Sequence, residues 1–510
     1  MKHSLITTLL AAGVCLAQEQ PPTKAPTVPD ILSHYYQKPK QSRIVDFSHA
    51  GNQTKLPADL KKFHAKDFGA LPNDDKDDSE ALQKAFDAIE ANQGGELLFE
   101  NGEYLVSQSL LVQTGNLRVQ GAGDTVIVLN SSADIGYSTP LFRIGKLNAN
   151  TKTMHTLTTG VLRHGSKIKP TSPKVEFKVG DILDLYGINT GGKLSYLLTE
   201  PTQQEDVVTR EHRLFSAYTP YRRAVTVTEV FGPGMGFRFS PAMPIPWDGP
   251  TWLSNFRMRT DMLKGVHFNR LKLQFKGRKP IAYGISVYDA ADIVLENLVV
   301  HNFCNAISMR DVKNGTINQI EISGDQALEG TVRLNRSWDC LVQNIHYSVT
   351  AKKGVGLMGS AHGNVFRKIT FDQGGNILLA SGDGFAMNNL FEQIDGARIT
   401  GDGACSPHSG NYNIFWNINC GKSLNPSHLL FSGYTNDSSL LKERGGKIDS
   451  NAHKGIPGSI VVGVRCEDGL LHVGGSTKDV VNDWIYTEKL NQGDITPASL
   501  YLDQCAKKAK

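Results

Sequence analysis

A short sequence pattern returns about every 24 residues between residues 281 and 420. Each copy closes on an aliphatic residue, and these residues are 22, 25, 24, 25 and 24 positions apart: Leu298, Ile320, Ile345, Ile369, Ile394 and Ile418. Short β-branched runs lie between them, separated by Gly, Asn and Asp, and leave no room for a helix. The pattern therefore predicts the coils of a parallel β-helix, in which only stacking buries the apolar faces. Leucine-rich, tetratricopeptide and ankyrin repeats fit worse, because they need a leucine frame or helices.

The composition agrees with an all-β solenoid. The chain has 50 glycines and only 8% aromatic residues, which suits a turn-rich chain. Its 54 basic and 50 acidic side chains leave a net charge of +4, so bulk charge gives no case for nucleic acid binding. Because a solenoid has one continuous core at any length, we predict one main domain over residues 61–510 with a long insert at about 186–222.

The first 17 residues have the pattern of a secretory signal peptide. Lys2 and His3 precede an apolar run, and Ala17 offers a cleavage site before polar residues. The run is about 12 residues long, too short to cross a bilayer, and no later stretch is apolar enough. We therefore expect a secreted protein, extracellular or periplasmic, without a membrane span. Residues 18–60 are rich in Pro, Gln and Lys, and we expect a linker or an N-terminal arm lying on the domain.

Six cysteines follow the predicted signal peptide: Cys304, Cys340, Cys405, Cys420, Cys466 and Cys505. In an exported chain they permit up to three disulfides, while buried thiols on inner strand faces are an equal alternative. The sequence contains no CxxC pair and no metal-type cluster of cysteine with histidine. We expect neither a metal nor another cofactor.

Residues 80–91 form a predicted amphipathic helix. Its apolar residues fall on one face: Ala81, Leu82, Ala85, Phe86 and Ile89. The aspartates before it are suited to the N-terminal end of a helix. We expect this helix to cap the open end of the solenoid, where the first coil would otherwise expose its strand edges.

The same region carries a family resemblance. The run Lys66 to Ala70, the helix, Gly94-Gly95 and Asn101 to Tyr104 resemble the amino-terminal signature of the pectate lyase superfamily, in its rhamnogalacturonase and epimerase-like branch. This resemblance implies a right-handed parallel β-helix and activity on acidic polysaccharides. It does not fix the reaction, because the fold hosts lyases, hydrolases, epimerases and phage tailspikes.

One face of the predicted solenoid gathers polar side chains. Alternation along the strands places Tyr288, Arg310 and Asn335 in one outward ladder, with Arg333 on the same face. Asp289, Asp311 and Arg336 fall at the adjoining turn. Later coils bring further candidates to about the same side: His362, Asp383, Asp402 and His408. Each residue taken singly could instead have a purely structural role. The arginines can form ion pairs with the aspartates, and the later candidates stand in turn-like sequences.

This face predicts a lyase acting on an acidic, uronate-containing polysaccharide. Arginine would neutralise the uronate carboxylate in place of calcium, and an imidazole or phenol would move protons. We predict as catalytic residues His362, His408, Arg336, Arg310 and Tyr288. We predict as substrate-binding residues Arg333, Asn335, Asp383, Asp402, Arg213 and Tyr221, the last two from the insert.

Two alternatives stay open from the sequence alone. A glycoside hydrolase of the same fold would need two carboxyl groups, about 5 to 5.5 Å apart for retention or 6.5 to 9.5 Å apart for inversion, and carboxylates one or two coils apart would provide either spacing. A non-catalytic polysaccharide-binding β-helix would need aromatic and amide side chains but no proton-transfer groups. The sugar, the linkage and the oligomeric state are not encoded in any pattern that we find.

Overall fold

A computed structural model describes most of the solenoid and its flanking elements. The described residues are 28–39, 42–130, 139–145, 155–156, 165–169, 175–187, 221–232, 235–243, 253–260, 262–277, 281–380, 384–401, 409–410, 412–421, 458–466, 486–492 and 495–509. In this part of the chain no helix is both long enough and apolar enough to cross a membrane.

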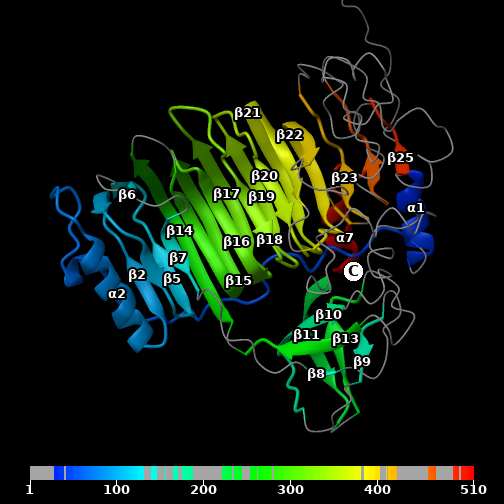
Figure 1. Cartoon of the computed structure of the whole chain (residues 1–510), viewed down its shortest axis with the longest axis horizontal. Coiled ribbons are helices and arrows are strands. Elements are labelled where there is room, and N and C mark those ends of the chain that lie inside the picture. Colours follow the sequence, from blue (N-terminus) through cyan, green and yellow to red (C-terminus); the bar gives the residue numbers. More distant parts are fainter. Residues whose placement is uncertain are drawn as a thin grey trace, which may run out of the picture.

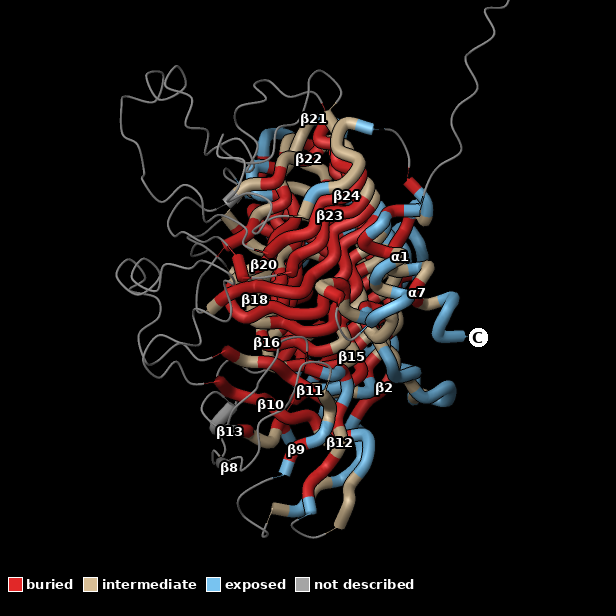
Figure 2. The backbone as a smooth tube through the Cα atoms, turned by 90° about the vertical axis from the view of Figure 1, so that its right-hand side faces the viewer, coloured by how far each residue is buried: buried red, intermediate tan, exposed pale blue. Residues whose placement is uncertain are grey.

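The main body is a parallel β-helix, as the repeat predicts. Successive coils follow one another along the long axis of the molecule (Figure 1), and most of their residues are buried (Figure 2). Nineteen strands join in one parallel sheet system. They are β1 (Lys62–His64), β2 (Gly95–Leu98), β3 (Gly102–Val106), β4 (Leu110–Val112), β5 (Leu117–Gln120), β6 (Thr125–Asn130), β7 (Pro140–Ile144), β14 (Leu263–Lys276), β15 (Tyr283–His301), β16 (Asn305–Lys313), β17 (Thr316–Ser323), β18 (Val332–Asn335), β19 (Leu341–Tyr347), β20 (Val355–Met358), β21 (Val365–Ala380), β22 (Leu390–Gly401), β23 (Ile414–Trp416), β24 (Ile460–Val462) and β25 (Tyr486–Glu488).

The repeated aliphatic residues form one inner stack. Leu298 pairs with Ile320, and the same register continues through Ile345, Ile369 and Ile394. Ile418 extends the stack on the next coil, where Asn419 donates its backbone N–H to the carbonyl of Ile394. All six side chains are at most 2% exposed. The predicted stack is therefore confirmed, and it is the centre of the core.

The polar residue before each stacked aliphatic has a structural reason. It adopts a left-handed backbone conformation in every copy, with φ between 49° and 55°: Asn297, Gln319, Asn344, Lys368, Gln393 and Asn417. This conformation turns the chain sharply between two strand segments, and asparagine tolerates it better than most residues. The period read from the sequence is thus the period of one recurring turn.

A ladder of buried asparagines holds another turn in register. Asn364 donates from Nδ2 to Oδ1 of Asn389 over 2.9 Å, and Asn389 donates in the same way to Asn413 over 3.0 Å. Each side-chain oxygen also accepts a backbone N–H of the preceding coil. All three side chains are fully buried. Buried polar groups are tolerated only when they are bonded, so the ladder fixes the alignment of three coils.

Helix α2 (Ser79–Ala91) covers the first coil, as predicted (Figure 1). Leu82, Phe86 and Ile89 are buried against the core. Asp77 accepts the backbone N–H of Ser79, the first helical residue, over 3.0 Å, as expected of an aspartate at a helix N-terminus, whereas Asp78 acts differently. Asp78, at the N-cap, accepts backbone N–H groups from Leu71 and Leu105, so its carboxylate ties the helix to the solenoid. A short 3-10 helix, η2 (Ala65–Phe68), precedes this region.

A second sheet lies outside the solenoid (Figure 1). It is antiparallel and contains β8 (His155–Thr156), β9 (Lys167–Ile168), β10 (Ile182–Gly187), β11 (Tyr221–Val230), β12 (Phe237–Ser240) and β13 (Leu253–Met258). Its apolar face packs on Phe385, Met387 and Tyr412 of the solenoid. Strands β10 and β11 flank the predicted insert at about 186–222, and they belong to this small sheet and not to a coil.

The two ends of the described chain meet on the solenoid flank. Helix α1 (Asp30–Gln37) and residues 42–50 lie beside helix α7 (Leu500–Lys508). The buried carboxylate of Glu392 accepts the backbone N–H groups of Leu500 and Tyr501 at the start of α7. Gln504 in turn donates to the carbonyl of Val45 over 2.8 Å. The start and the end of the chain therefore stabilise the same coils.

We expect Asn389→Ala to lower the free energy of unfolding by about 2 to 3 kcal/mol, because it leaves the buried backbone N–H of Asn364 without a partner and removes one hydrogen bond from each neighbouring side-chain amide. Urea unfolding followed by circular dichroism would measure the change. Asn318→Ala is the matched control, since Asn318 accepts a hydrogen bond from Asn344 in an exposed asparagine pair, and it should cost less than about 1 kcal/mol. Equal costs for the two variants would contradict the role of the buried ladder.

Candidate functional site

Three predicted site residues lie side by side on one solenoid face. Tyr288 pairs with Arg310 across neighbouring strands, and Arg310 pairs with Asn335 on the following coil. Each of these side chains is partly exposed. The row continues on the next two coils with Met358 and Ala380. Strand alternation thus places a phenol, a guanidinium and an amide in one line, about 4.8 Å from strand to strand.

A groove of about 610 Å³ continues this face, and we call it the sheet-face groove. Met358 and Ala380 line it, which joins it to the row of Tyr288 and Arg310. Its charged lining consists of Arg333, Lys352, Lys353 and Glu329, three cations and one carboxylate, for a net formal charge of +2. Glu329 forms an ion pair with Lys353. Arg333 and Lys352 therefore supply the excess positive charge.

Two other grooves have balanced charge. A groove of about 620 Å³ is lined by two cations and two carboxylates, Lys352, Arg398, Asp372 and Asp395. A groove of about 420 Å³ lies under the N-terminal arm and is lined by Lys55, Arg118, Asp292 and Glu296, together with His267. The sheet-face groove is therefore better suited to an anionic ligand than either of these.

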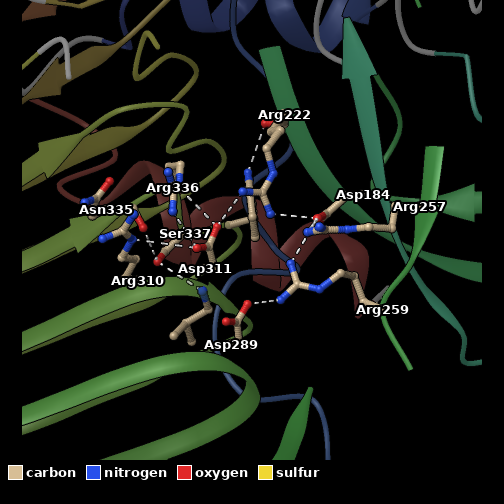
Figure 3. Close-up of polar contacts among 12 residues, drawn as sticks. Asp184, Arg222, Arg257, Arg259, Asp289, Arg310, Asp311, Asn335, Arg336 and Ser337 are labelled. Carbon is tan, nitrogen blue, oxygen red and sulfur yellow. Dashed lines mark hydrogen bonds and ion pairs between the residues drawn. The ribbon is translucent and has the colours of Figure 1, made fainter. Parts of the chain in front are cut away.

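Charged residues from the small sheet and the solenoid meet in a network that we call the junction cluster (Figure 3). Its members are Asp184, Arg222, Arg257, Arg259, Asp289, Arg310, Asp311 and Arg336. One Asp184 oxygen, Oδ2, accepts from three guanidinium groups, at 2.7 Å from Arg222 and 2.9 Å from Arg257 and from Arg259. Arg259 reaches on to Asp289 of the solenoid. The network therefore fastens the small sheet to the coils.

Asp311 is the second centre of the junction cluster. Arg336 holds it with two hydrogen bonds, Nε to Oδ1 at 3.2 Å and Nη2 to Oδ2 at 2.8 Å. Arg222 reaches the same carboxylate from the small sheet at 2.9 Å. Arg310 is held least, with its Nε 3.9 Å from Asp311 and 41% of its side chain exposed. Arg310 is therefore the cluster arginine most open to a ligand.

The charges of the junction cluster do not balance. Five guanidinium groups face three carboxylates, which leaves a net formal charge of +2. Burial alone would raise the pKa of Asp184, but its three arginine partners outweigh that effect and hold the pKa well below its usual range. Burial raises the pKa of Asp289 against the influence of Arg259. The surplus positive charge favours an anion at the accessible edge of the cluster.

His362 does not lie on the accessible face. It is fully buried, its Nδ1 lies 3.3 Å from the carbonyl of Met387, and its ring lies 4.7 Å from the ring of Tyr221. Burial and the nearby charge of Arg223 lower its pKa to about 3. Tyr221 is only 2% exposed. This arrangement differs from the expectation that both residues face a substrate, because the small sheet covers this turn of the solenoid.

Four predicted site residues lie outside the described residues: His408, Asp383, Asp402 and Arg213. Their roles stay predictions. Within the described ranges, no group of three or more His, Cys, Asp or Glu side chains is placed to hold a metal ion.

The residues predicted from the sequence did not include Asp184, Arg257, Arg259 or the two groove lysines, Lys352 and Lys353. A signal for Asp184 exists, since it interrupts an apolar strand between Leu183 and Leu185. A carboxylate in such a strand is buried only with partners. No local signal identifies those partners, because they come from other strands of the small sheet.

We expect Asp184→Asn to destabilise the protein by about 3 to 5 kcal/mol, since it removes the buried negative charge that Arg222, Arg257 and Arg259 share. The folded pKa of Asp184 is depressed, so its contribution to stability is present above its unfolded pKa, about 3.9, and is lost as pH falls further. The variant should therefore lose less stability than the wild type between pH 5 and pH 2.

Thermal unfolding across that pH range would measure both effects of Asp184→Asn. Glu229→Gln is the matched control, because Glu229 pairs with Arg238 on the exposed surface of the same small sheet, and it should cost less than about 1 kcal/mol. A cost for Asp184→Asn no larger than that of the control would show that the junction cluster does not stabilise the fold.

We expect His362 to make the protein less stable below about pH 6.5. The unfolded imidazole takes up a proton near that pH, whereas the buried imidazole stays neutral down to about pH 3. Stability should then fall by about 1.4 kcal/mol per pH unit. His362→Gln, neutral at every pH, should remove this slope in urea unfolding at pH 7.5 and 5. His346→Gln is the control, because His346 forms an exposed pair with Asp372, and it should keep the pH dependence of stability. If His362→Gln shows the same pH dependence as the wild type, buried His362 is not its source.

The comparisons with known proteins agree with this fold. Residues 63–164 match the family model described as "Rhamnogalacturonase A/epimerase, pectate lyase-like". Mannuronan C5-epimerase AlgE1 of Azotobacter vinelandii is 41% identical over 100 residues, 18% of this chain and 7% of that protein. The iota-carrageenase of Alteromonas macleodii is 36% identical over 111 residues, 22% of this chain and 21% of that protein. The chain therefore spans less than a quarter of the length of either relative.

Among solved structures, the tailspike protein gp49 of Pseudomonas phage LKA1 aligns with a TM-score of 0.46 at 12% identity. The alignment covers 79% of this chain and 71% of that one. The family match covers about a fifth of the chain, and it includes the run near Lys66, helix α2 and the glycines that follow it. The predicted resemblance to the pectate lyase superfamily is thereby confirmed.

Proposed function

We propose that this protein is a secreted enzyme that cleaves an acidic, uronate-containing polysaccharide by β-elimination. The observation that carries the proposal is the positively charged sheet-face groove, which runs into the row of Tyr288, Arg310 and Asn335. The relatives add support of a general kind, because both are named for action on polysaccharides.

The groove would hold the anionic chain through Arg333 and Lys352. Both are in its lining, and neither forms an ion pair with another described residue, whereas Lys353 is paired with Glu329. Arg333 on strand β18 and Lys352 in the bend before strand β20 would meet different negative groups of an extended polymer. This arrangement favours a polyanion over a neutral glucan and makes binding sensitive to salt.

The reacting uronate would place its carboxylate at Arg310. Among the arginines of the junction cluster, Arg310 is the most exposed and has the longest ion-pair distance. An arginine can bind a carboxylate through two parallel hydrogen bonds. Neutralising the carboxylate acidifies the proton on C5. A base takes this proton, and the electron pair of the broken C5–H bond forms the C4–C5 double bond. The C4–O bond breaks, and its electron pair leaves with the oxygen. Arg336, held on Asp311, positions the neighbouring turn instead of touching substrate.

Tyr288 is the described group best placed to transfer protons, because it is the strand neighbour of Arg310. Its phenol would give a proton to the leaving oxygen. His408 stays our prediction for the base that takes the C5 proton. His362 has no part in this scheme, since it is buried as a neutral imidazole.

A hydrolase of the same fold is less well supported. Hydrolysis needs two carboxyl groups on either side of the scissile bond. In the described lining of the sheet-face groove, Glu329 is the single carboxylate, and it is paired with a lysine. Asp289 and Asp311 lie near the row but are held by arginines.

The test uses the full-length protein with a panel of uronic acid polymers, followed by absorbance at 235 nm, reducing ends and proton NMR. We expect absorbance to grow with the number of new chain ends, because each β-elimination leaves one unsaturated sugar. Reducing ends without absorbance would indicate hydrolysis, inversion at C5 without cleavage would indicate epimerisation, and binding without any product would indicate a non-catalytic protein. Each of these three outcomes would refute the lyase proposal.

For the variants, Arg310→Ala and Tyr288→Phe should each lower kcat by about 10²- to 10⁴-fold. Arg333→Ala should act mainly on binding and raise KM by about tenfold or more. Lys84→Ala is the control, because Lys84 lies on the capping helix and pairs with Glu80 on the surface, and it should leave both constants unchanged. Unchanged kcat in Arg310→Ala, with folding intact by circular dichroism, would remove Arg310 from the mechanism.

A further inference from the structure

Two cysteines of the last coils lie side by side. Asn419 and Arg465 form a parallel bridge, and the backbone N–H of Cys420 donates to the carbonyl of Arg465 over 2.8 Å. The next residue on each coil is a cysteine, Cys420 and Cys466, and their thiols are hydrogen bonded to each other. Cys420 is only 3% exposed, and Cys466 is partly buried against the same core. Both side chains therefore point into the solenoid at the same position of successive coils.

We propose that Cys420 and Cys466 form an intercoil disulfide in an oxidising environment. A disulfide requires Cα atoms about 4.4 to 6.8 Å apart. Neighbouring strands lie about 4.8 Å apart, so two residues paired in register meet this requirement with little movement of the backbone. The thiol contact shows that the side chains already face each other.

Two of the other described thiols, those of Cys340 and Cys505, lie in different settings. The sulfur of Cys340 accepts the backbone N–H of Gly315 and lies 3.5 Å from the carbonyl of Trp338, where it continues the column of buried asparagines. Cys505 lies on helix α7 at the solenoid flank, where its thiol interacts with Tyr501. These contacts indicate that Cys340 has a packing role in the core. Cys505 lies apart on helix α7 and therefore serves as the control in the experiment below.

The reaction is an ordinary thiol–disulfide exchange with a disulfide oxidant such as glutathione disulfide. The thiolate of Cys466 attacks one sulfur of the oxidant and releases one glutathione thiolate. Cys420 then loses its proton and attacks the Cys466 sulfur, which forms the new bond and releases the second glutathione. Two protein thiols are oxidised, and one oxidant disulfide is reduced to two thiols. The hydrogen bond with Cys466 and burial both raise the pKa of Cys420, so the more exposed Cys466 reacts first.

The disulfide would stabilise the carboxyl-terminal end of the solenoid. It would close a ring that contains the 45 residues between the two cysteines, 421–465. Such a bond lowers the entropy of the unfolded chain, and the effect is larger for longer rings. Strand β24 lies inside this ring and pairs with β25, whose Glu488 accepts the backbone N–H of Asp30 at the start of α1. The bond would therefore also support the attachment of the N-terminal arm.

The test begins with the reduced full-length protein and incubates it with glutathione disulfide. Digestion without reductant, followed by mass spectrometry, should give one joined peptide pair that contains Cys420 and Cys466. The midpoint of thermal unfolding should rise by about 5 °C on oxidation and return when dithiothreitol is added. Cys505→Ser should keep the joined pair and the shift.

Cys466→Ser should give neither the joined peptide pair nor the shift of the unfolding midpoint on oxidation. Under reducing conditions it should unfold at the same midpoint as the reduced wild type, which separates loss of the disulfide from loss of packing. Two results would overturn the proposal. One is a different joined pair, and the other is that both cysteines remain free to an alkylating reagent under denaturing conditions after oxidation. Neither result depends on enzymatic activity, so the proposed function is tested separately.

Discussion

Stacking of coils in register is the constraint on which the rest of this structure depends. No coil has a closed core of its own, so each apolar side chain is buried only when the next coil places an apolar side chain beside it. The stack from Leu298 to Ile418 and the asparagine ladder from Asn364 to Asn413 meet this constraint in two ways. The aliphatic stack removes apolar area from water. The asparagine ladder opposes any shift of one coil against another, because a shift would leave buried amide groups without hydrogen-bond partners.

The same regularity gives the solenoid a rigid outer face. Strands in register deliver side chains at fixed spacing, so Tyr288, Arg310 and Asn335 form a line without any specific loop to arrange them. Rigid placement suits a site that must meet a repeating polymer, because little entropy is lost when the ligand binds. The groove at Arg333 and Lys352 is an extension of that line and not a separate feature.

The small antiparallel sheet borders one side of this solenoid face. Its arginines cross to the solenoid carboxylates, and its apolar side buries Phe385 and Met387. A buried ionic junction of this kind is costly to form, since each charge loses water, and it persists because every carboxylate has at least one partner. The junction leaves more positive than negative charge at the boundary of the proposed site. Fastening the sheet and attracting an anionic ligand are thus two results of one arrangement.

The sequence by itself determined the β-helix, the capping helix and the order of residues along the outward face. These features follow from local periods, namely the 24-residue repeat, the alternation within strands and the helical spacing near Phe86. Only the tertiary structure decided which polar groups are accessible. His362 stands in a glycine-containing turn that suits a surface imidazole, yet Tyr221, 141 positions earlier in the chain, covers it. Arg222 likewise reaches Asp311 from a strand of another sheet. Contacts between such distant segments depend on how two separately folded surfaces pack, and no local pattern of residues records that packing.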